Sequence, residues 1–174
     1  MKLNIGCGNK AIDGYIGVDK FQCNAADYIC DIENEQLPFD DNSVDDIVLD
    51  NVIEHFNDIP KVINELIRVS KKGCLIKIIT PHFSALSSWI DPTHVHHLSY
   101  FSFDHFEKTS VSHYVGKGIK IQSKKLSFGG GVLGLIARFL FKINPKKYEQ
   151  KYCFIFRAST LSFCLKVNEK NPSN

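Results

Sequence analysis

The sequence predicts an α/β fold in which a mostly parallel sheet carries helices on both faces. Short apolar strands alternate with helices and loops through the first eighty residues, which is typical of parallel α/β sheets. Gly6, Gly8 and Asp19 stand directly after two of these strands, and ligands of such sheets bind beyond the strand ends. A chain of 174 residues suits one domain, which we expect over 3–167, with 168–174 as a frayed polar tail.

The first half of the chain contains five expected strands and one helix. Only about ten residues separate Gly8 from Asp19, too few for a crossover helix of ordinary length, so we expect an abbreviated first crossover. Pro60, an apolar stripe after it and the closing Lys71-Lys72-Gly73 predict a helix. The strands are expected at 3–5, 15–18, 28–30, 46–49 and 74–80, and the helix at 60–70.

The second half is less regular. Residues 82–113 are rich in aromatic side chains and histidines and are expected to be loop-like. The glycines at 129–131 predict a flexible break. A helix is expected at 132–143, and strands at 119–122 (extended by Leu126), 153–156 and 161–165.

Helix 132–143 carries an apolar stripe with two interpretations. The stripe is formed by Val132, Leu133, Ile136, Phe139, Leu140 and Ile143. It packs on the sheet or across a homodimer, as such stripes usually do, or it touches lipid with Lys142, Lys146 and Lys147 beside it. A peripheral membrane contact through 132–147 and a homodimer therefore both stay open.

Composition favours an ordinary globular protein of the cytoplasm. Apolar residues make up 44% and charged residues 23% of the chain. The first residues form a strand rather than the apolar core of a signal peptide, and no apolar run reaches the roughly 18 residues of a membrane span. We expect a cytoplasmic protein, with attachment to the inner membrane face as the alternative. The six cysteines form no CxxC pair, so reduced thiols are expected.

Charge is distributed unevenly along the chain. Residues 1–60 hold 3 basic and 13 acidic side chains, whereas residues 108–174 hold 13 basic and 2 acidic ones. A basic carboxyl-terminal third suggests an anionic neighbour, which could be a phosphorylated substrate, a nucleic acid or an acidic membrane surface. A solvated basic face is the alternative.

The Gly6-Cys7-Gly8 turn indicates a ribose-bearing cofactor. Glycines at a strand end let the backbone approach a ligand, and Asp19 can accept hydrogen bonds from two ribose hydroxyls. A dinucleotide needs these glycines to open a helix that holds its pyrophosphate, but Asp13-Gly14 interrupts any such helix. S-adenosyl-L-methionine has no phosphate and fits this pattern better than NAD.

The chain resembles the class I S-adenosylmethionine-dependent methyltransferases, and within them the type-11 methyltransferase domains, over residues 3–107. The matching segments are Leu3-Asn4-Ile5-Gly6-Cys7-Gly8 with Asp19, Asp31-Ile32, the loop from Leu37 to Asp45, and Val52-Ile53-Glu54-His55-Phe56. The resemblance implies a Rossmann-like sheet with an antiparallel C-terminal strand, and S-adenosyl-L-methionine as cofactor.

The resemblance also implies roles for individual residues. Asp19 would bind the ribose, and Asp31 would contact the adenine amine. The implied cofactor-binding residues are Gly6, Cys7, Gly8, Asp19, Lys20, Asp31, Ile32, Asp50, Asn51 and His55. The abbreviated link before Asp19 is similar to a subgroup associated with cell-surface polysaccharide or lipid modification.

The acid/base candidates follow the strand at 74–80. Methyl transfer needs a base only where the acceptor loses a proton, as a hydroxyl does. His94 is the favoured base, with Asp91 and Tyr100 as further catalytic candidates and His55 in support. A structural role for His94 is the alternative. No metal is expected, because the histidine spacing is not that of a zinc site.

The sequence therefore predicts a methyltransferase acting at oxygen on a small-molecule or lipid- or sugar-linked acceptor. The first alternative is a non-catalytic module that binds S-adenosylmethionine or S-adenosylhomocysteine and acts through a partner. A nucleic-acid methyltransferase is a further alternative, supported by the basic third but by no motif for a flipped base. An NAD-dependent oxidoreductase is the last.

Overall fold

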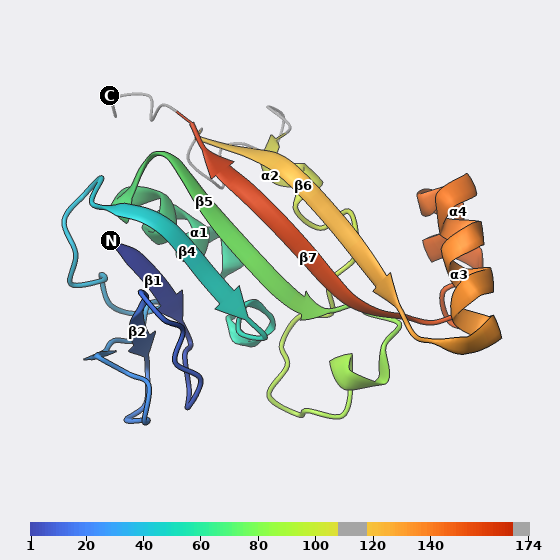
Figure 1. Cartoon of the computed structure of the whole chain (residues 1–174), viewed down its shortest axis with the longest axis horizontal. Coiled ribbons are helices and arrows are strands. Elements are labelled where there is room, and N and C mark those ends of the chain that lie inside the picture. The colour runs from blue at the N-terminus through green and yellow to red at the C-terminus, as the bar shows by residue number, and fades with distance from the viewer. Residues whose placement is uncertain (108–117, 169–174) are drawn as a thin grey trace.

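The computed structural model describes residues 1–107 and 118–168 (Figure 1). Within them, seven strands form one sheet in the order β3-β2-β1-β4-β5-β7-β6. The strands are β1 (Lys2–Ile5), β2 (Ile16–Asp19), β3 (Tyr28–Ile29), β4 (Val44–Asp50), β5 (Ser70–Pro81), β6 (Ile119–Phe128) and β7 (Ala158–Val167). The helices are η1 (Ile53–His55), α1 (Ile59–Val69), η2 (Leu86–Ser88), α2 (Asp104–Glu107), α3 (Gly131–Ile143) and α4 (Pro145–Lys151).

The directions of the strands bring the carboxyl ends of six of them to one edge of the sheet. β1 to β5 pair in parallel, and β7 pairs antiparallel with both β5 and β6. The predicted parallel sheet with an antiparallel C-terminal strand is therefore confirmed. Because β6 runs in the same direction as β5, the carboxyl ends of β1 to β6 all lie at the same edge, which we call the carboxyl edge.

The helix α1 forms where the sequence predicts it. Asp58 caps its amino end by accepting a hydrogen bond from the Lys61 backbone N–H at 2.9 Å, and Pro60 lies in its first turn. Its buried side chains are Ile59, Val62, Ile63, Leu66, Ile67 and Val69. They join the core cluster formed by the buried side chains of β1, β4 and β5.

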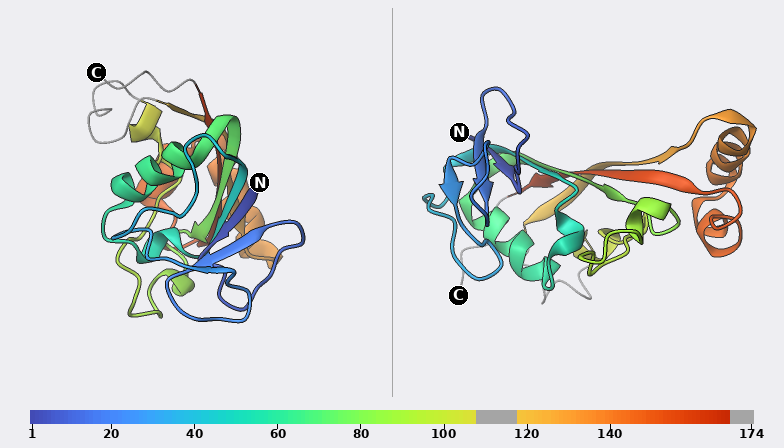
Figure 2. Two further views of the ribbon diagram at one scale, coloured as in Figure 1. Left: turned by 90° about the vertical axis from the view of Figure 1, so that its left-hand side faces the viewer. Right: turned by 90° about the horizontal axis from the view of Figure 1, so that it is seen from below.

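The prediction of helices on both faces of the sheet is wrong. Figure 2 shows α1 on one face, and in the described residues no helix covers the opposite face of β5 and β7. On β5, Ile76 and Ile78 are fully buried on the α1 side, whereas Leu75 and Ile79 on the opposite face remain partly exposed. The connections before β2 and β3 are loops too short for helices, as the abbreviated first crossover predicted.

The carboxyl-terminal half departs from the sequence prediction in two places. Residues 153–156 are not a strand but turns, because α4 precedes them and the Phe156 backbone N–H donates to the Tyr152 carbonyl at 2.9 Å. The helix α4 itself was not predicted. Its amino end is capped by the Asn144 side chain, which accepts from the Lys147 backbone N–H at 2.9 Å. The predicted strand at 119–122 with Leu126 is confirmed as β6.

The helix α3 forms as predicted, but its stripe does not pack on the sheet. The buried residues of α3 are Gly134 and Ala137, whereas Val132, Leu133, Phe139 and Ile143 are exposed. The α3–α4 hairpin extends beyond the carboxyl edge instead of covering a face (Figure 1). Leu140 of the stripe packs against the core, whereas these four side chains lie outside it.

Candidate functional site

A cavity opens at the carboxyl edge, where β1, β2 and β4 end. Its volume is about 440 Å³, within the range of small-ligand sites. It is lined by Ile5, Gly6, Val18, Asp19, Lys20, Phe21, Cys30, Asp31, Ile32, Glu33, Asn51, Val52, His55, Phe56 and Thr93. Apolar side chains together with several carboxylates in the lining suit a nucleoside that carries a positive charge.

The glycine turn after β1 has a conformation that other residues rarely adopt. Gly6 has φ +66° and Gly8 has φ +51°. A Cβ added to Gly6 would lie 2.4 Å and 2.6 Å from the two Cγ atoms of Val52, whereas a Cβ on Gly8 would meet open space. Gly6 is therefore required for the contact with the Val52 wall, and Gly8 leaves room above the turn.

Asp19 ends β2 and is held by two backbone N–H groups. The Gly8 N–H donates to its Oδ2 at 2.9 Å, and the Phe21 N–H donates to its Oδ1 at 3.0 Å. Each carboxylate oxygen can accept a second hydrogen bond. The side chain is therefore oriented before any ligand arrives and keeps acceptor capacity toward the cavity.

Asp31, two residues beyond β3, is fixed in the same way. The Glu33 N–H donates to its Oδ1 at 3.1 Å and the Asn34 side-chain amide to its Oδ2 at 2.8 Å. Glu33 in turn accepts from the backbone N–H groups of Asn57 at 2.7 Å and Asp58 at 2.8 Å. These bonds join the β3 loop to the start of α1 and close that side of the cavity.

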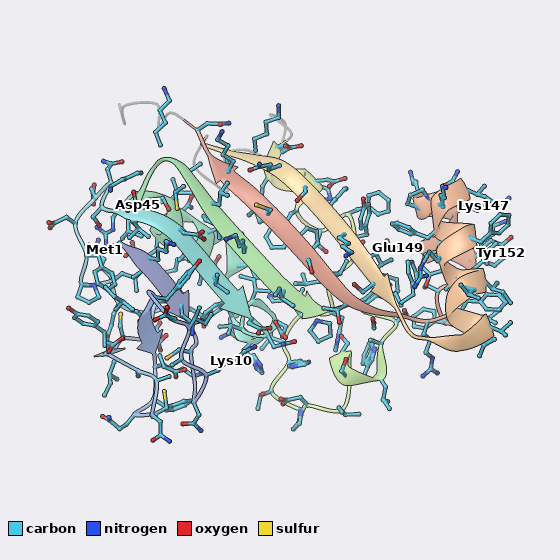
Figure 3. All side chains as sticks on the ribbon, viewed as in Figure 1. Met1, Lys10, Asp45, Lys147, Glu149 and Tyr152 are labelled. Carbon is cyan, nitrogen blue, oxygen red and sulfur yellow. The ribbon has the colours of Figure 1, made fainter. Side chains whose placement is uncertain are left out.

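Three of the residues that the resemblance implied for the cofactor lie outside the cavity wall. Burial and the neighbouring Cys23 raise the pKa of the Cys7 thiol to about 12, so it stays protonated behind the turn. Gly8 orients Asp19, as described above. Asp50 forms an ion pair with Lys10, which reaches toward the end of β4 (Figure 3). They support the wall rather than form it.

Gly6, Asp19, Lys20, Asp31, Ile32, Asn51 and His55, the other implied residues, do line the cavity. Asn51 has φ +55°, and its side-chain amide donates to Asp50 at 2.9 Å. Sequence reasoning missed Phe21, Glu33 and Thr93. Phe21 and Glu33 each lie two residues beyond a predicted acid, which is the one local signal that could have found them.

Two histidines and a buried carboxylate meet beside the cavity. His55 lines it, and the rings of His55 and His94 are 4.7 Å apart between centroids. Glu54, 1% exposed, accepts from the Thr80 hydroxyl at 3.0 Å, while its Oε1 has no hydrogen-bond partner among the described residues. Burial raises the pKa of Glu54. Its Oε1 lies 4.0 Å from His94 Nε2.

Asp91 joins this group from the solvent side. Its Oδ2 lies 3.8 Å from His94 Nε2, and hydrogen bonds from the hydroxyl and the backbone N–H of Thr93 hold the pKa of Asp91 below its usual value. Tyr100, also predicted as catalytic, is elsewhere. Its ring packs against Phe141 at 5.0 Å, and the described residues give it no contact with His94 or Asp91.

Two groups of side chains could approach a metal ion. The ligand atoms of Glu54, His55 and His94 lie within 4.8 Å of one another, as do those of Cys7, Asp19 and Cys23. The second group contains the protonated Cys7 thiol, which disfavours it. The expectation that the site holds no metal stays a prediction, which chelation of the purified protein can test.

The comparisons with known proteins agree with this geometry. Residues 15–78 match the family model of the methyltransferase domain. The chain has the fold of a class I methyltransferase over most of its length. The match begins after the Gly6-Cys7-Gly8 turn, so that turn is supported by the geometry alone. No curated protein sequence matches the chain.

Solved structures show the same fold at low sequence identity. An S-adenosylmethionine-dependent methyltransferase from Archaeoglobus fulgidus is similar with a TM-score of 0.61 and 18% identity, covering 95% of this chain and 85% of that one. The YcgJ protein from Bacillus subtilis has a TM-score of 0.61 and 16% identity, covering 98% and 92%. The [4+2]-cyclase SpnF has a TM-score of 0.61 and 15% identity, covering 96% and 75%, so this fold also supports other reactions.

The cavity suits S-adenosylmethionine better than NAD. The wall carries Asp19, Asp31 and Glu33, which favour a sulfonium cation and would repel a pyrophosphate. No helix follows the Gly6-Cys7-Gly8 turn, so the usual binding site for the pyrophosphate of NAD is missing from residues 6–15. Both observations disfavour the oxidoreductase alternative.

Proposed function

We propose that this methyltransferase transfers the methyl group of S-adenosylmethionine to a hydroxyl oxygen of a small-molecule or lipid- or sugar-linked acceptor. The observation that carries the proposal is the group formed by His55, His94, Asp91 and the buried Glu54 at the mouth of the cavity. A hydroxyl must lose its proton as it is methylated, and these side chains can take it up.

Two carboxylates hold the cofactor in this proposal. Asp19 would accept from the ribose hydroxyls, and Asp31 from the adenine amine, because both keep acceptor capacity toward the cavity. Gly6, Asn51 and His55 would line the remaining wall. When bound, the cofactor supplies an activated methyl group on its sulfonium sulfur.

One hydrogen bond of His94 selects the tautomer of its neutral ring. Its Nδ1 lies 3.1 Å from the Ser88 carbonyl oxygen, which can only accept, so Nδ1 carries a hydrogen and Nε2 of the neutral ring holds the lone pair. As the methyl group leaves the sulfonium sulfur, whose carbon–sulfur bond breaks, and bonds to the acceptor oxygen, Nε2 would take up the hydroxyl proton. Glu54 and Asp91 flank Nε2 and stabilise the imidazolium that results.

His55 lies between His94 and the cavity wall, so the two histidines have separable roles. An acceptor that enters on the Asp91 side meets His94 directly, whereas one held over the cavity meets His55 first. In single-turnover assays we expect His94→Gln to lower the rate constant about 100-fold or more while leaving the affinity for S-adenosylhomocysteine unchanged. If only His55→Gln has that effect, His55 is the base.

Calorimetric titration with S-adenosylhomocysteine and NAD tests the cofactor. We expect binding of the first only, and Asp19→Ala to lose about 1.5–3 kcal/mol, a roughly 10- to 150-fold weaker Kd. Asp13→Ala, an exposed acid in the same amino-terminal segment, is the matched control and should bind normally. Binding of NAD alone would overturn the proposal, and unchanged affinity in Asp19→Ala would remove Asp19 from the site.

The non-catalytic alternative stays testable beside this one. The fold similarity to a [4+2]-cyclase is the observation that keeps it, because a class I fold does not guarantee methyl transfer. A module that acts only through a partner would bind S-adenosylhomocysteine and retain its function in His94→Gln. Loss of methyl transfer in that variant excludes this alternative.

A further inference from the structure

The helix α3 is apolar apart from Arg138 and Lys142, but it is covered on one side only. Gly134 and Ala137 face the protein, and a Cβ added to Gly134 would lie 1.8 Å from the Gly129 carbonyl oxygen, so the inner face is closely packed. The exposed side chains are Val132 at 71%, Leu133 at 63%, Leu135 at 61%, Phe139 at 65% and Ile143 at 65%. A continuous apolar helix face is normally covered, so the outer face of α3 lacks a cover.

Four of these five exposed side chains form one stripe. At about 100° per residue, Leu135, Phe139, Val132 and Ile143 fall within an arc of about 80°, directly opposite Ala137. This outward stripe is nearly as long as the helix of 13 residues. In the described residues, no helix is both long and apolar enough to cross a membrane. The stripe is therefore suited to lie along a surface.

The stripe continues onto neighbouring loops at the same carboxyl edge. Leu86, Trp89 and Ile90 are 63%, 57% and 67% exposed, and Phe154 and Ile155 are 62% and 68% exposed. The two loops meet at Phe83, whose ring is 5.6 Å from that of Phe154 and whose carbonyl oxygen accepts from the Trp89 indole at 2.7 Å. We call these loops and the α3 stripe together the apolar edge.

Basic side chains surround the apolar edge. The exposed ones on the hairpin and the turn after it are Arg138, Lys142, Lys146, Lys147, Lys151 and Arg157. Glu149 is the single acid of segment 129–157. It lies on the side of α4 that faces the sheet, where His82, Ser99 and Tyr100 bind it, whereas Lys147 lies on the outer side (Figure 3). The outer surface of the hairpin is thus apolar in the middle and positive around it.

We propose that the apolar edge docks on the surface of an anionic phospholipid membrane. Apolar side chains would enter the acyl boundary while the surrounding lysines and arginines contact anionic headgroups. A second copy of this chain suits the surface less well, because a symmetric contact would bring the same basic side chains of both copies together. The cofactor cavity opens at the same carboxyl edge, toward the β3 end of the sheet.

The docking does not depend on methyl transfer, whereas the lipid character of the acceptor rests on the proposed function. Flotation of the full chain with phosphatidylcholine vesicles, with and without phosphatidylserine, tests the docking. We expect flotation with the anionic vesicles that weakens as salt is added. The fraction of the Arg138→Gln/Lys142→Gln variant that floats with these vesicles should be lower by about fivefold or more.

Leu135→Ser/Phe139→Ser removes the centre of the stripe and should abolish flotation. Ile29→Ser is the matched control, because Ile29 is 56% exposed on β3 at the opposite end of the sheet, and it should float normally. Circular dichroism and urea unfolding verify that each variant is folded.

Three outcomes overturn the docking: no flotation with either vesicle, normal flotation of Leu135→Ser/Phe139→Ser, or a dimer in light scattering that this variant dissociates. The last would assign the surface to a second copy. A chain that floats but binds no S-adenosylhomocysteine contradicts only the proposed function. A chain that binds it but does not float contradicts only the docking.

Discussion

Two helices of this chain have similar apolar stripes and opposite environments. The helix α1 lies over the sheet between β4 and β5 and buries six apolar side chains. The helix α3 extends from the end of β6 and buries only Gly134 and Ala137. An apolar stripe therefore does not by itself show that a helix packs on the sheet of its own chain. The position of the helix relative to the sheet decides whether the stripe is buried there.

The largest expected effect is the difference in unfolding free energy when the same substitution, Leu→Ala, is made in each helix. Leu66→Ala in α1 should lower the free energy of unfolding by about 2–5 kcal/mol, because Leu66 is fully buried in the core. Leu135→Ala in α3, at 61% exposure, should change it by less than about 0.5 kcal/mol. Urea unfolding of both variants measures the difference. Equal losses would mean that α3 is covered in solution by something this fold does not show.

The second effect concerns how the hairpin is attached. Glu149 accepts from His82 Nε2 at 3.0 Å, from the Ser99 hydroxyl at 2.8 Å and from the Tyr100 N–H at 2.8 Å. Glu149→Ala should cost about 1–3 kcal/mol, because it leaves these donors without a partner. Glu149→Gln, which still offers one acceptor oxygen, should cost less. A neutral effect in urea unfolding would show that α4 is held by apolar contacts alone.

Glu149 also predicts an acid-sensitive attachment. Burial raises its pKa, but the hydrogen bonds from His82, Tyr100 and Ser99 outweigh burial and hold the pKa below the ordinary value. Because the folded-state pKa is depressed, its stabilisation is complete above the unfolded pKa of about 4.3 and is lost as the pH falls through the folded value. The stability of Glu149→Gln should therefore depend less on pH in this range.

The smallest expected effect concerns Glu54, the other buried carboxylate. Burial raises the pKa of Glu54, so its contribution to stability falls as the pH rises from the unfolded pKa toward the folded one and stays lower above it. Glu54→Gln should keep the contact with Thr80 and be as stable as the parent at pH 8, or more stable by up to about 1 kcal/mol. Thermal unfolding between pH 4 and 8 measures this. A large loss at pH 8 would show that the Glu54 charge is compensated.

The sequence predicted the parts of the fold that short-range patterns determine. Apolar strands followed by Gly6, Asp19 and Asp31 predicted the carboxyl edge, and Pro60 with its periodic stripe predicted α1. The path of the chain across a cavity has no such periodicity. Glu33 and Thr93 reach the wall through loops whose course depends on tertiary hydrogen bonds, so the sequence did not identify them.

The errors have physical causes as well. The aromatic and β-branched residues near Ile155 favoured a strand, but the Asn144 cap and the proline after it start a helix and place Ile155 in the turn that follows. The apolar stripe of α3 exists as predicted, but the sequence pattern could not show whether the sheet would bury it. Helices were expected on both faces because most α/β sheets have them, but the links before β2 and β3 are too short to form them.

The His82–Glu149 contact spans 67 residues, and this separation affects the order in which the chain folds. Contacts between distant segments close large loops and form late, whereas β1, β4 and β5 lie closer in sequence. During synthesis the first eighty residues can collapse before α4 has left the ribosome. We therefore expect the strands around the cavity, β1, β2 and β4, to assemble first. The part of the sheet next to α4 is completed only when β7 is inserted between β5 and β6.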